Sequence, residues 1–233
     1  MDYLDLKKLG AIDPIAFQAC EPYPFVNPEG LLHQEAHRKL VENLPPLELF
    51  TKIQSKRRRY GQKSHDRYTL EYEDGLPLPS PWQEFIDELR GEPYRALLCR
   101  LLGIPDLEPR FHWHWATVGE SVSPHCDAKR KLGSHVFYLN TEEEWDPTWG
   151  GQTLVLDDGG RFSSDSSPAF EDFEEIACAQ ASGNWSFIFS RRGNSWHGVK
   201  EVVCPEGHFR KVFIVVIDKP GLRRRLTRTL SGS

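Results

Sequence analysis

The chain has 233 residues, of which 39% are hydrophobic and 12% aromatic, so it can bury a sizeable core and is not expected to be disordered. Its formal net charge of −5 makes a protein that coats nucleic acid unlikely, although a local basic groove remains compatible with it. Five cysteines without a Cys-x-x-Cys pair indicate reduced thiols inside a cell. No apolar run approaches the roughly 20 residues of a membrane span, and the start lacks a signal-peptide pattern, so we expect a cytoplasmic protein without membrane contact.

The first 109 residues are expected to be a lead-in with supporting helices, within a single domain that covers residues 1–233. Prolines interrupt any long helix over the first 28 residues, which we expect to run over the surface of the main domain. Apolar residues at helical spacing predict three helices, over 29–43, 82–90 and 94–102.

A basic run, Arg57-Arg58-Arg59 followed by Tyr60, precedes the second of these helices. A solvated face is one interpretation of such a run, and a nucleic-acid patch or a clamp for an acidic substrate is another. Because the run comes shortly before the predicted catalytic core, Arg57, Arg58 and Arg59 are candidate substrate contacts.

Alternating and continuous apolar segments after residue 109 predict a β-rich core over 110–218, followed by a basic tail over 219–233. The last strand is apolar throughout from Val212 to Ile217, so it should be central and buried. The number of strands is that of a double-stranded β-helix, a jelly roll of the cupin type. The expected strands are 110–118, 121–127, 133–140, 151–157, 173–180, 185–191, 197–203 and 209–218.

One short motif in this core has the composition of a metal site. Residues i and i+2 of a strand share a face, so His125 and Asp127 can point the same way. If the fold adds His197, the set becomes two histidines and one carboxylate, which suits non-haem Fe(II) with open coordination positions. Two other histidine pairs, His33 with His37 and His112 with His114, are rival ligands. The acidic residue between the first pair is not at the metalloprotease position and no third ligand suggests itself, and the second pair lacks a carboxylate partner at short range.

The order of motifs around this set resembles the Fe(II)/2-oxoglutarate-dependent dioxygenases, in particular their prolyl 4-hydroxylase-like branch, over residues 110–218. The motifs are His125-Cys126-Asp127, Phe137-Tyr138-Leu139-Asn140, Trp145-Asp146, Gly150-Gly151-Gln152-Thr153-Leu154, Asn194-Ser195-Trp196-His197-Gly198-Val199 and Phe209-Arg210-Lys211-Val212-Phe213.

The resemblance implies a hydroxylase that uses Fe(II), 2-oxoglutarate and O₂, with ascorbate as an optional addition, and that releases succinate and CO₂. It implies that His125, Asp127 and His197 are the catalytic metal ligands. Arg210 would hold the far carboxylate of 2-oxoglutarate by a bidentate contact, and Lys211 is the competing cation. Neighbours on a strand face opposite ways, so only one of the two can point inward.

Two aromatic residues complete the implied site. Tyr138 matches a tyrosine that donates a hydrogen bond to the cosubstrate. Trp115 stands where the family carries another tyrosine, and it is therefore a candidate substrate contact with different chemistry, because an indole N–H donates but does not accept. The substrate is expected to be a protein side chain such as proline or a small metabolite. A non-catalytic jelly-roll protein that binds a metal or ligand is the alternative, and nucleic acid is not an expected partner.

Overall fold

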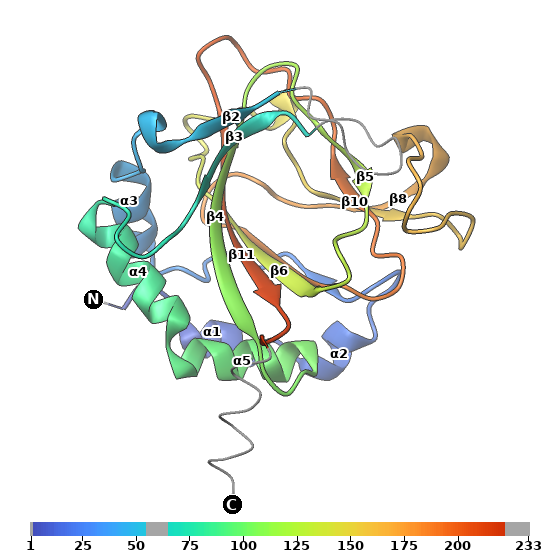
Figure 1. The fold of residues 1–233 in the computed structure, drawn as a ribbon, viewed down its shortest axis with the longest axis horizontal. Coiled ribbons are helices and arrows are strands. Elements are labelled where there is room, and N and C mark those ends of the chain that lie inside the picture. Colours follow the sequence, from blue (N-terminus) through green and yellow to red (C-terminus); the bar gives the residue numbers. More distant parts are fainter. Residues whose placement is uncertain (1, 55–64, 222–233) are drawn as a thin grey trace, which may run out of the picture.

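Two antiparallel sheets pack against each other in the computed structural model, which describes residues 2–54 and 65–221 (Figure 1). The larger sheet has the strand order β1-β9-β6-β11-β4-β3-β2, and the smaller has the order β5-β10-β7-β8. The strands are β1 (Phe25–Val26), β2 (Thr51–Ile53), β3 (Arg67–Glu71), β4 (Glu108–Ala116), β5 (Val122–His125), β6 (Lys131–Tyr138), β7 (Leu154–Asp157), β8 (Glu174–Cys178), β9 (Ser186–Ser190), β10 (His197–Val199) and β11 (Arg210–Asp218).

All eight strands expected from the sequence are present, as β4 to β11. Four of them, β4, β6, β9 and β11, belong to the larger sheet, and the other four form the smaller sheet. This is the double-stranded β-helix that the sequence predicted. Strands β1, β2 and β3 were not predicted, and they extend the larger sheet at its two edges.

Strand β11 lies between β4 and β6, as its apolar sequence predicted. Alternate side chains of β11 lie in two different buried layers, which explains why the strand has no polar face. Phe213, Val215 and Ile217 belong to the core under the helices. Val212, Ile214 and Val216 line a pocket between the two sheets.

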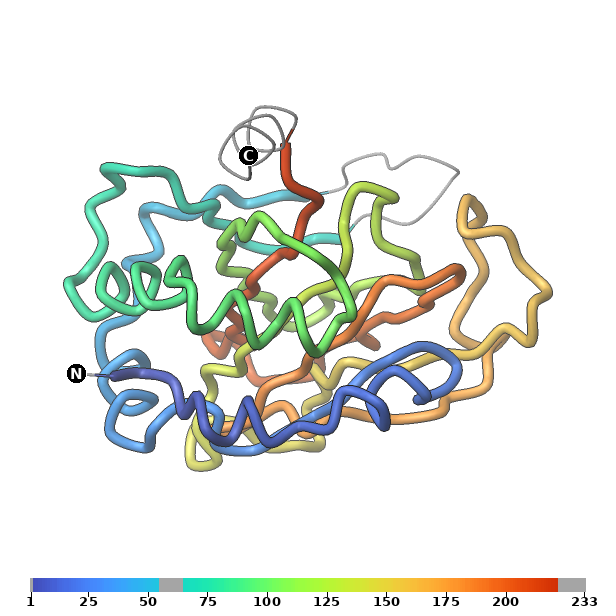
Figure 2. Tube along the Cα trace, turned by 90° about the horizontal axis from the view of Figure 1, so that it is seen from below, coloured from blue at the N-terminus to red at the C-terminus, as the bar shows by residue number. Residues whose placement is uncertain are grey.

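The helices cover the face of the larger sheet that points away from the smaller one (Figures 1 and 2). They are α1 (Leu6–Ala11), α2 (Pro14–Gln18), α3 (Gln34–Glu42), α4 (Ser80–Arg90) and α5 (Glu92–Leu102). Trp82 of α4 anchors the layer, with its ring 5.1 Å from that of Trp113 and 5.0 Å from that of Phe213. The three helices predicted from periodicity are thus found, with shifted ends. None of the helices in the described residues is long and apolar enough to cross a membrane.

The first 28 residues are not a surface lead-in. Tyr3 and Phe17 are buried in the core under the helices, and the Tyr3 backbone N–H donates to Glu88 of α4 at 2.7 Å. Tyr23 packs in the core between the sheets, where its hydroxyl donates to the Trp196 carbonyl at 2.9 Å. The prolines do limit α1 and α2 to short helices, but the aromatic side chains between them find buried positions.

Candidate metal centre

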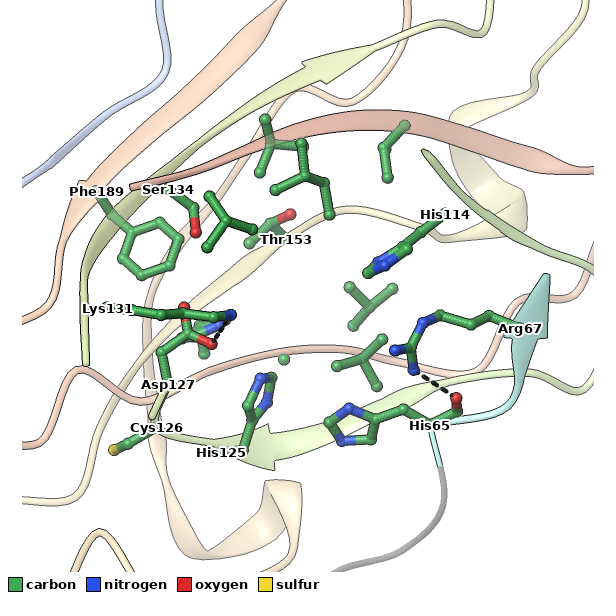
Figure 3. A pocket seen from close by; sticks show the side chains of 18 of the residues that line it. His65, Arg67, His114, His125, Cys126, Asp127, Lys131, Ser134, Thr153 and Phe189 are labelled. Atoms are coloured by element: carbon green, nitrogen blue, oxygen red, sulfur yellow. Dashed lines mark hydrogen bonds and ion pairs between the residues drawn. The ribbon is translucent and has the colours of Figure 1, made fainter. Parts of the chain in front are cut away.

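The two histidines of the predicted triad lie directly opposite each other on neighbouring strands. His125 ends β5 and His197 begins β10, and the antiparallel register pairs them, with ring centroids 4.4 Å apart. Asp127 lies just beyond the end of β5, whereas the sequence predicted a strand that reached it. Its carboxylate still turns to the same side as the imidazole of His125 (Figure 3). One ligand atom from each of the three residues lies within 4.8 Å of the other two.

Backbone carbonyls orient both imidazoles in the same way. The Nδ1 atom of His125 lies 3.0 Å from the Ser123 carbonyl oxygen, and that of His197 lies 3.0 Å from the Ser195 carbonyl oxygen. A carbonyl can only accept, so each Nδ1 carries a proton, and Nε2 is the ring nitrogen that a metal ion can use as its ligand. A hydrogen bond from the ring nitrogen that does not bind the metal to a backbone carbonyl is usual for a metal-binding histidine.

Asp127 supplies the negative charge of the triad and is held by Lys131, whose Nζ lies 2.7 Å from its carboxylate. Burial acts to raise the pKa of Asp127, but attraction to Lys131 and His197 outweighs burial and lowers the pKa below its usual value. The carboxylate is therefore ionised at neutral pH. Two imidazoles and one carboxylate fit Fe(II), and a set of three ligands leaves coordination positions open.

The rival histidine pairs do not form a comparable group within the described residues. His112 and His114 share the inner face of β4, but burial lowers the pKa of His112 to about 4 and that of His114 well below its usual value. The Nε2 atom of His37 faces the Tyr138 carbonyl at 3.4 Å in the core. Among the described residues, only the predicted triad brings together three potential ligands.

A pocket of about 300 Å³ opens beside the triad, between the two sheets. This is the lower end of the size range for small-molecule sites. One wall is apolar and comes from β6, β9, β10 and β11. The polar lining residues are His65, Arg67, His114, His125, Asp127, Lys131, Ser134, Thr153, His197 and Arg210.

Arg210 enters this pocket from the start of β11. Its side chain is buried, and its Nε donates to the Gly151 carbonyl. Gly151 has φ of +88°, and a Cβ placed there would lie 2.9 Å from the Arg210 Cδ, so glycine is needed both for the turn and for the close approach. Arg210 forms no ion pair with a carboxylate of the described chain. Its guanidinium is thus a buried positive charge that an anionic ligand could neutralise.

Lys211, the competing cation, points to the other side of the larger sheet. Its Nζ contacts the Glu144 carboxylate and lies 5.9 Å from the centre of the Trp115 ring. The alternation expected from the sequence therefore places Arg210, and not Lys211, in the pocket.

The two predicted aromatic contacts do not line the pocket. Tyr138 is buried behind it, and its hydroxyl donates to Thr153 Oγ1 at 2.8 Å. Trp115 lies on the opposite face of β4 from His114, and its ring packs 4.4 Å from that of Phe50. Strand alternation turns the buried Trp115 indole to the other face of β4, so it does not line this pocket, and its contact with substrate stays a prediction. The basic run Arg57-Arg58-Arg59 lies outside the described residues.

Lys131, His65 and Arg67 are among the pocket residues that were not recognised as site residues from the sequence. Lys131 follows Asp127 after a tight turn, and the opposite charges at this short spacing were the available signal. Arg67 begins β3, which was not predicted as a strand, and His65 lies two residues before it. His65 packs its ring 4.6 Å from that of His125, and its Nε2 lies 3.0 Å from Ser123 Oγ.

Solved structures share this architecture over nearly the whole chain. A prolyl 4-hydroxylase of Pseudomonas putida superposes with a TM-score of 0.60 and 16% identity, covering 91% of this chain and 99% of that one. A prolyl hydroxylase of Trichoplax adhaerens, in complex with a hypoxia inducible factor peptide, gives 0.62 and 13%, covering 91% of both chains. The chain has the prolyl 4-hydroxylase fold.

The same fold also carries other chemistry. A non-haem α-ketoglutarate-dependent carbocyclase of nogalamycin biosynthesis superposes with a TM-score of 0.59 and 11% identity, covering 95% of this chain and 92% of that one. No protein-family profile and no curated protein sequence matches the chain. The prolyl 4-hydroxylase fold therefore does not by itself determine the substrate, which depends on the residues of the site.

Proposed function

We propose that the protein is an Fe(II)- and 2-oxoglutarate-dependent dioxygenase that hydroxylates a small metabolite or a protein side chain such as proline. The observation that carries the proposal is the convergence of His125, Asp127 and His197 beside a buried arginine that pairs with no carboxylate in the described part of the chain. When bound, Fe(II) and 2-oxoglutarate supply the oxidising chemistry: one oxygen atom of O₂ enters succinate as CO₂ leaves, and the other becomes the hydroxyl group of the product.

The triad would hold Fe(II) through the Nε2 atoms of His125 and His197 and one carboxylate oxygen of Asp127. The carbonyls of Ser123 and Ser195 keep both imidazoles in the ligating tautomer before any metal arrives. Lys131 keeps Asp127 ionised and limits its rotation. The ligands are thus preorganised, which reduces the ordering needed on binding.

Arg210 would hold the far carboxylate of 2-oxoglutarate. Its Nε is already committed to the Gly151 carbonyl, so the outer edge of the guanidinium remains for a two-point contact with a carboxylate. Thr153, which accepts from Tyr138 and lines the pocket, is a further polar group near this end. Val136, Phe189 and Val212 line the pocket as apolar neighbours and would exclude water from the reacting groups.

The test is anaerobic addition of Fe(II) and then 2-oxoglutarate to the purified protein, with the visible charge-transfer band of the chelated cosubstrate as readout. We expect the band in the wild type and not in Asp127→Ala. His114→Gln is the matched control, because His114 lines the same pocket but is not in the triad. Loss of the band in the control, or its persistence in Asp127→Ala, would reject the assignment of ligands.

The alternative function, a non-catalytic protein that binds a metal or ligand, predicts a different outcome of the same experiment. Metal binding would be measurable by calorimetry, but 2-oxoglutarate would produce no band and no succinate would form in air. The retention of both histidines, the aspartate and the buried arginine favours the enzyme.

A further inference from the structure

A second arginine of the pocket forms no ion pair with a carboxylate among residues 2–54 and 65–221, and the proposed reaction does not use it. Arg67 begins β3 and lines the pocket that contains the triad (Figure 3). Its Nη1 donates to the His65 carbonyl at 2.7 Å, and its Nε is buried without a hydrogen-bond partner. The side chain therefore lines a space that a ligand can enter and retains a donor without a partner among the described residues.

The groups around Arg67 do not neutralise it. Asp66 and Glu120 attract it through space, but neither forms an ion pair with it in the described chain. Burial lowers the pKa of Arg67, and the nearby imidazole of His114 is neutral because its own burial lowers its pKa far below neutrality. A half-buried charge left in this state is unfavourable for the fold. Its presence is explained if a ligand supplies the missing anion.

The charge of the whole pocket leads to the same conclusion. The charged lining residues are three cations, Arg67, Lys131 and Arg210, against one carboxylate, Asp127. A divalent metal ion and the dianion of 2-oxoglutarate cancel each other, so loading the site leaves the excess of two positive charges unchanged. One further anion of two charges would balance it, and an anion of one charge would halve it.

The two arginines approach the pocket from different places. Arg210 comes from β11 and is held against Gly151, whereas Arg67 comes from β3 and is held by the carbonyl of His65, whose ring packs on His125. Arg67 is thus tied to the triad through one intervening residue. A ligand bound by Arg67 and a cosubstrate bound by Arg210 need not compete for the same guanidinium.

We infer that Arg67 binds a carboxylate of the substrate, and that the substrate is a small carboxylic acid rather than a polypeptide side chain. The inference rests on the proposed function and narrows its substrate class. The pocket of about 300 Å³ has to hold both the cosubstrate and the substrate, which favours a molecule of a few carbon atoms beyond its carboxylate. Arginine suits this role because its planar fork matches a carboxylate in two-point geometry.

The experiment compares free acids with their primary amides, which have nearly the same shape without the negative charge. The probes are butanoate, pentanoate, L-proline, L-leucine and L-glutamate, each paired with its amide. Dissociation constants are measured by calorimetry on the protein loaded anaerobically with Fe(II) and 2-oxoglutarate. We expect at least one acid to bind about tenfold or more tightly than its amide, and to accelerate decay of the charge-transfer band when O₂ is admitted.

Variants of Arg67 test whether a preference for the acid over its amide depends on this side chain. Arg67→Gln should reduce the acid-to-amide ratio to near one while leaving the dissociation constant of 2-oxoglutarate within about twofold. Removing a half-buried charge that has no ion-pair partner among the described residues should not prevent folding. Arg67→Lys, which retains the charge, should keep part of the preference for acid over amide. Arg130→Gln is the control for general charge effects, because Arg130 precedes Lys131 but its side chain is 61% exposed.

Three results would overturn the inference. The first is that no acid binds the wild type better than its amide. The second is that Arg67→Gln keeps the preference. The third is that Arg67→Gln weakens 2-oxoglutarate about tenfold, which would assign Arg67 to the cosubstrate. Failure of the proposed function is distinguishable from failure of this inference, because the charge-transfer band would then be absent from the wild type. In that case the acid–amide comparison is made by calorimetry on the metal-free protein.

Discussion

Gly151 offers a direct test of how the fold positions the arginine of the proposed cosubstrate site. In Gly151→Ala, the new Cβ would lie 2.9 Å from Cδ and 3.3 Å from Nε of Arg210, so the buried side chain has to shift. The shift would misplace the guanidinium relative to the far carboxylate of 2-oxoglutarate. A charge-assisted contact is worth about 1.5–3 kcal/mol, so we expect the dissociation constant for 2-oxoglutarate to rise by roughly 10- to 150-fold.

The same substitution also has a backbone cost, which needs its own control. Gly151 has φ of +88°, and alanine there costs about 1–2 kcal/mol of unfolding free energy. Gly75 has φ of +90° with no heavy atom within 4 Å of a Cβ placed on it. Gly75→Ala should therefore show a similar loss in urea unfolding but unchanged 2-oxoglutarate affinity by calorimetry. Equal affinities in the two variants would refute the role assigned to Gly151.

Three further outcomes follow from the site and the core. Arg210→Gln should weaken 2-oxoglutarate binding about tenfold or more, whereas Lys211→Met should leave it unchanged, and the reverse pattern in calorimetry would exchange their roles. Mn(II) at about 100 times its dissociation constant should raise the unfolding free energy of the wild type by about 2.7 kcal/mol but not that of His197→Ala, and a metal-dependent gain in the variant would argue against the triad. Burial holds the pKa of His135 at about 3 in the folded chain against 6.5 in the unfolded one, so unfolding takes up a proton between these values and stability falls as the pH falls. From pH 7 to pH 5 the loss due to His135 should be about 2 kcal/mol, absent in His135→Phe by urea unfolding, and an equal slope in the two proteins would contradict it.

The hydrophobic periodicity of the sequence predicted the strands well where each face of a strand lies in a single environment. The eight strands of the double-stranded β-helix were all identified, and the apolar run of β11 correctly indicated a central position. Short segments were missed, because β1 and β2 are two and three residues long and too short to show a period. The aromatic residues of the first 28 positions were placed on the surface, although Tyr3 and Phe17 are buried. Their burial depends on helices α4 and α5, which are distant in the sequence.

The ligand set of the candidate metal centre was determined by the sequence alone, since His125 and Asp127 are local neighbours and the order of later motifs pointed to His197. Strand alternation also limited the cosubstrate cation to one of Arg210 and Lys211, because adjacent side chains face opposite ways.

The choice between these two cations was made only by the tertiary structure, which turns Arg210 into the pocket and pairs Lys211 with Glu144 outside it. The tertiary structure also brought Arg67 to the triad and turned Trp115 away from it. The physical reason is that a pocket is lined by whichever faces two sheets present to each other. Which face that is depends on strand pairing across long separations, such as β3 with β4, and local sequence does not encode it.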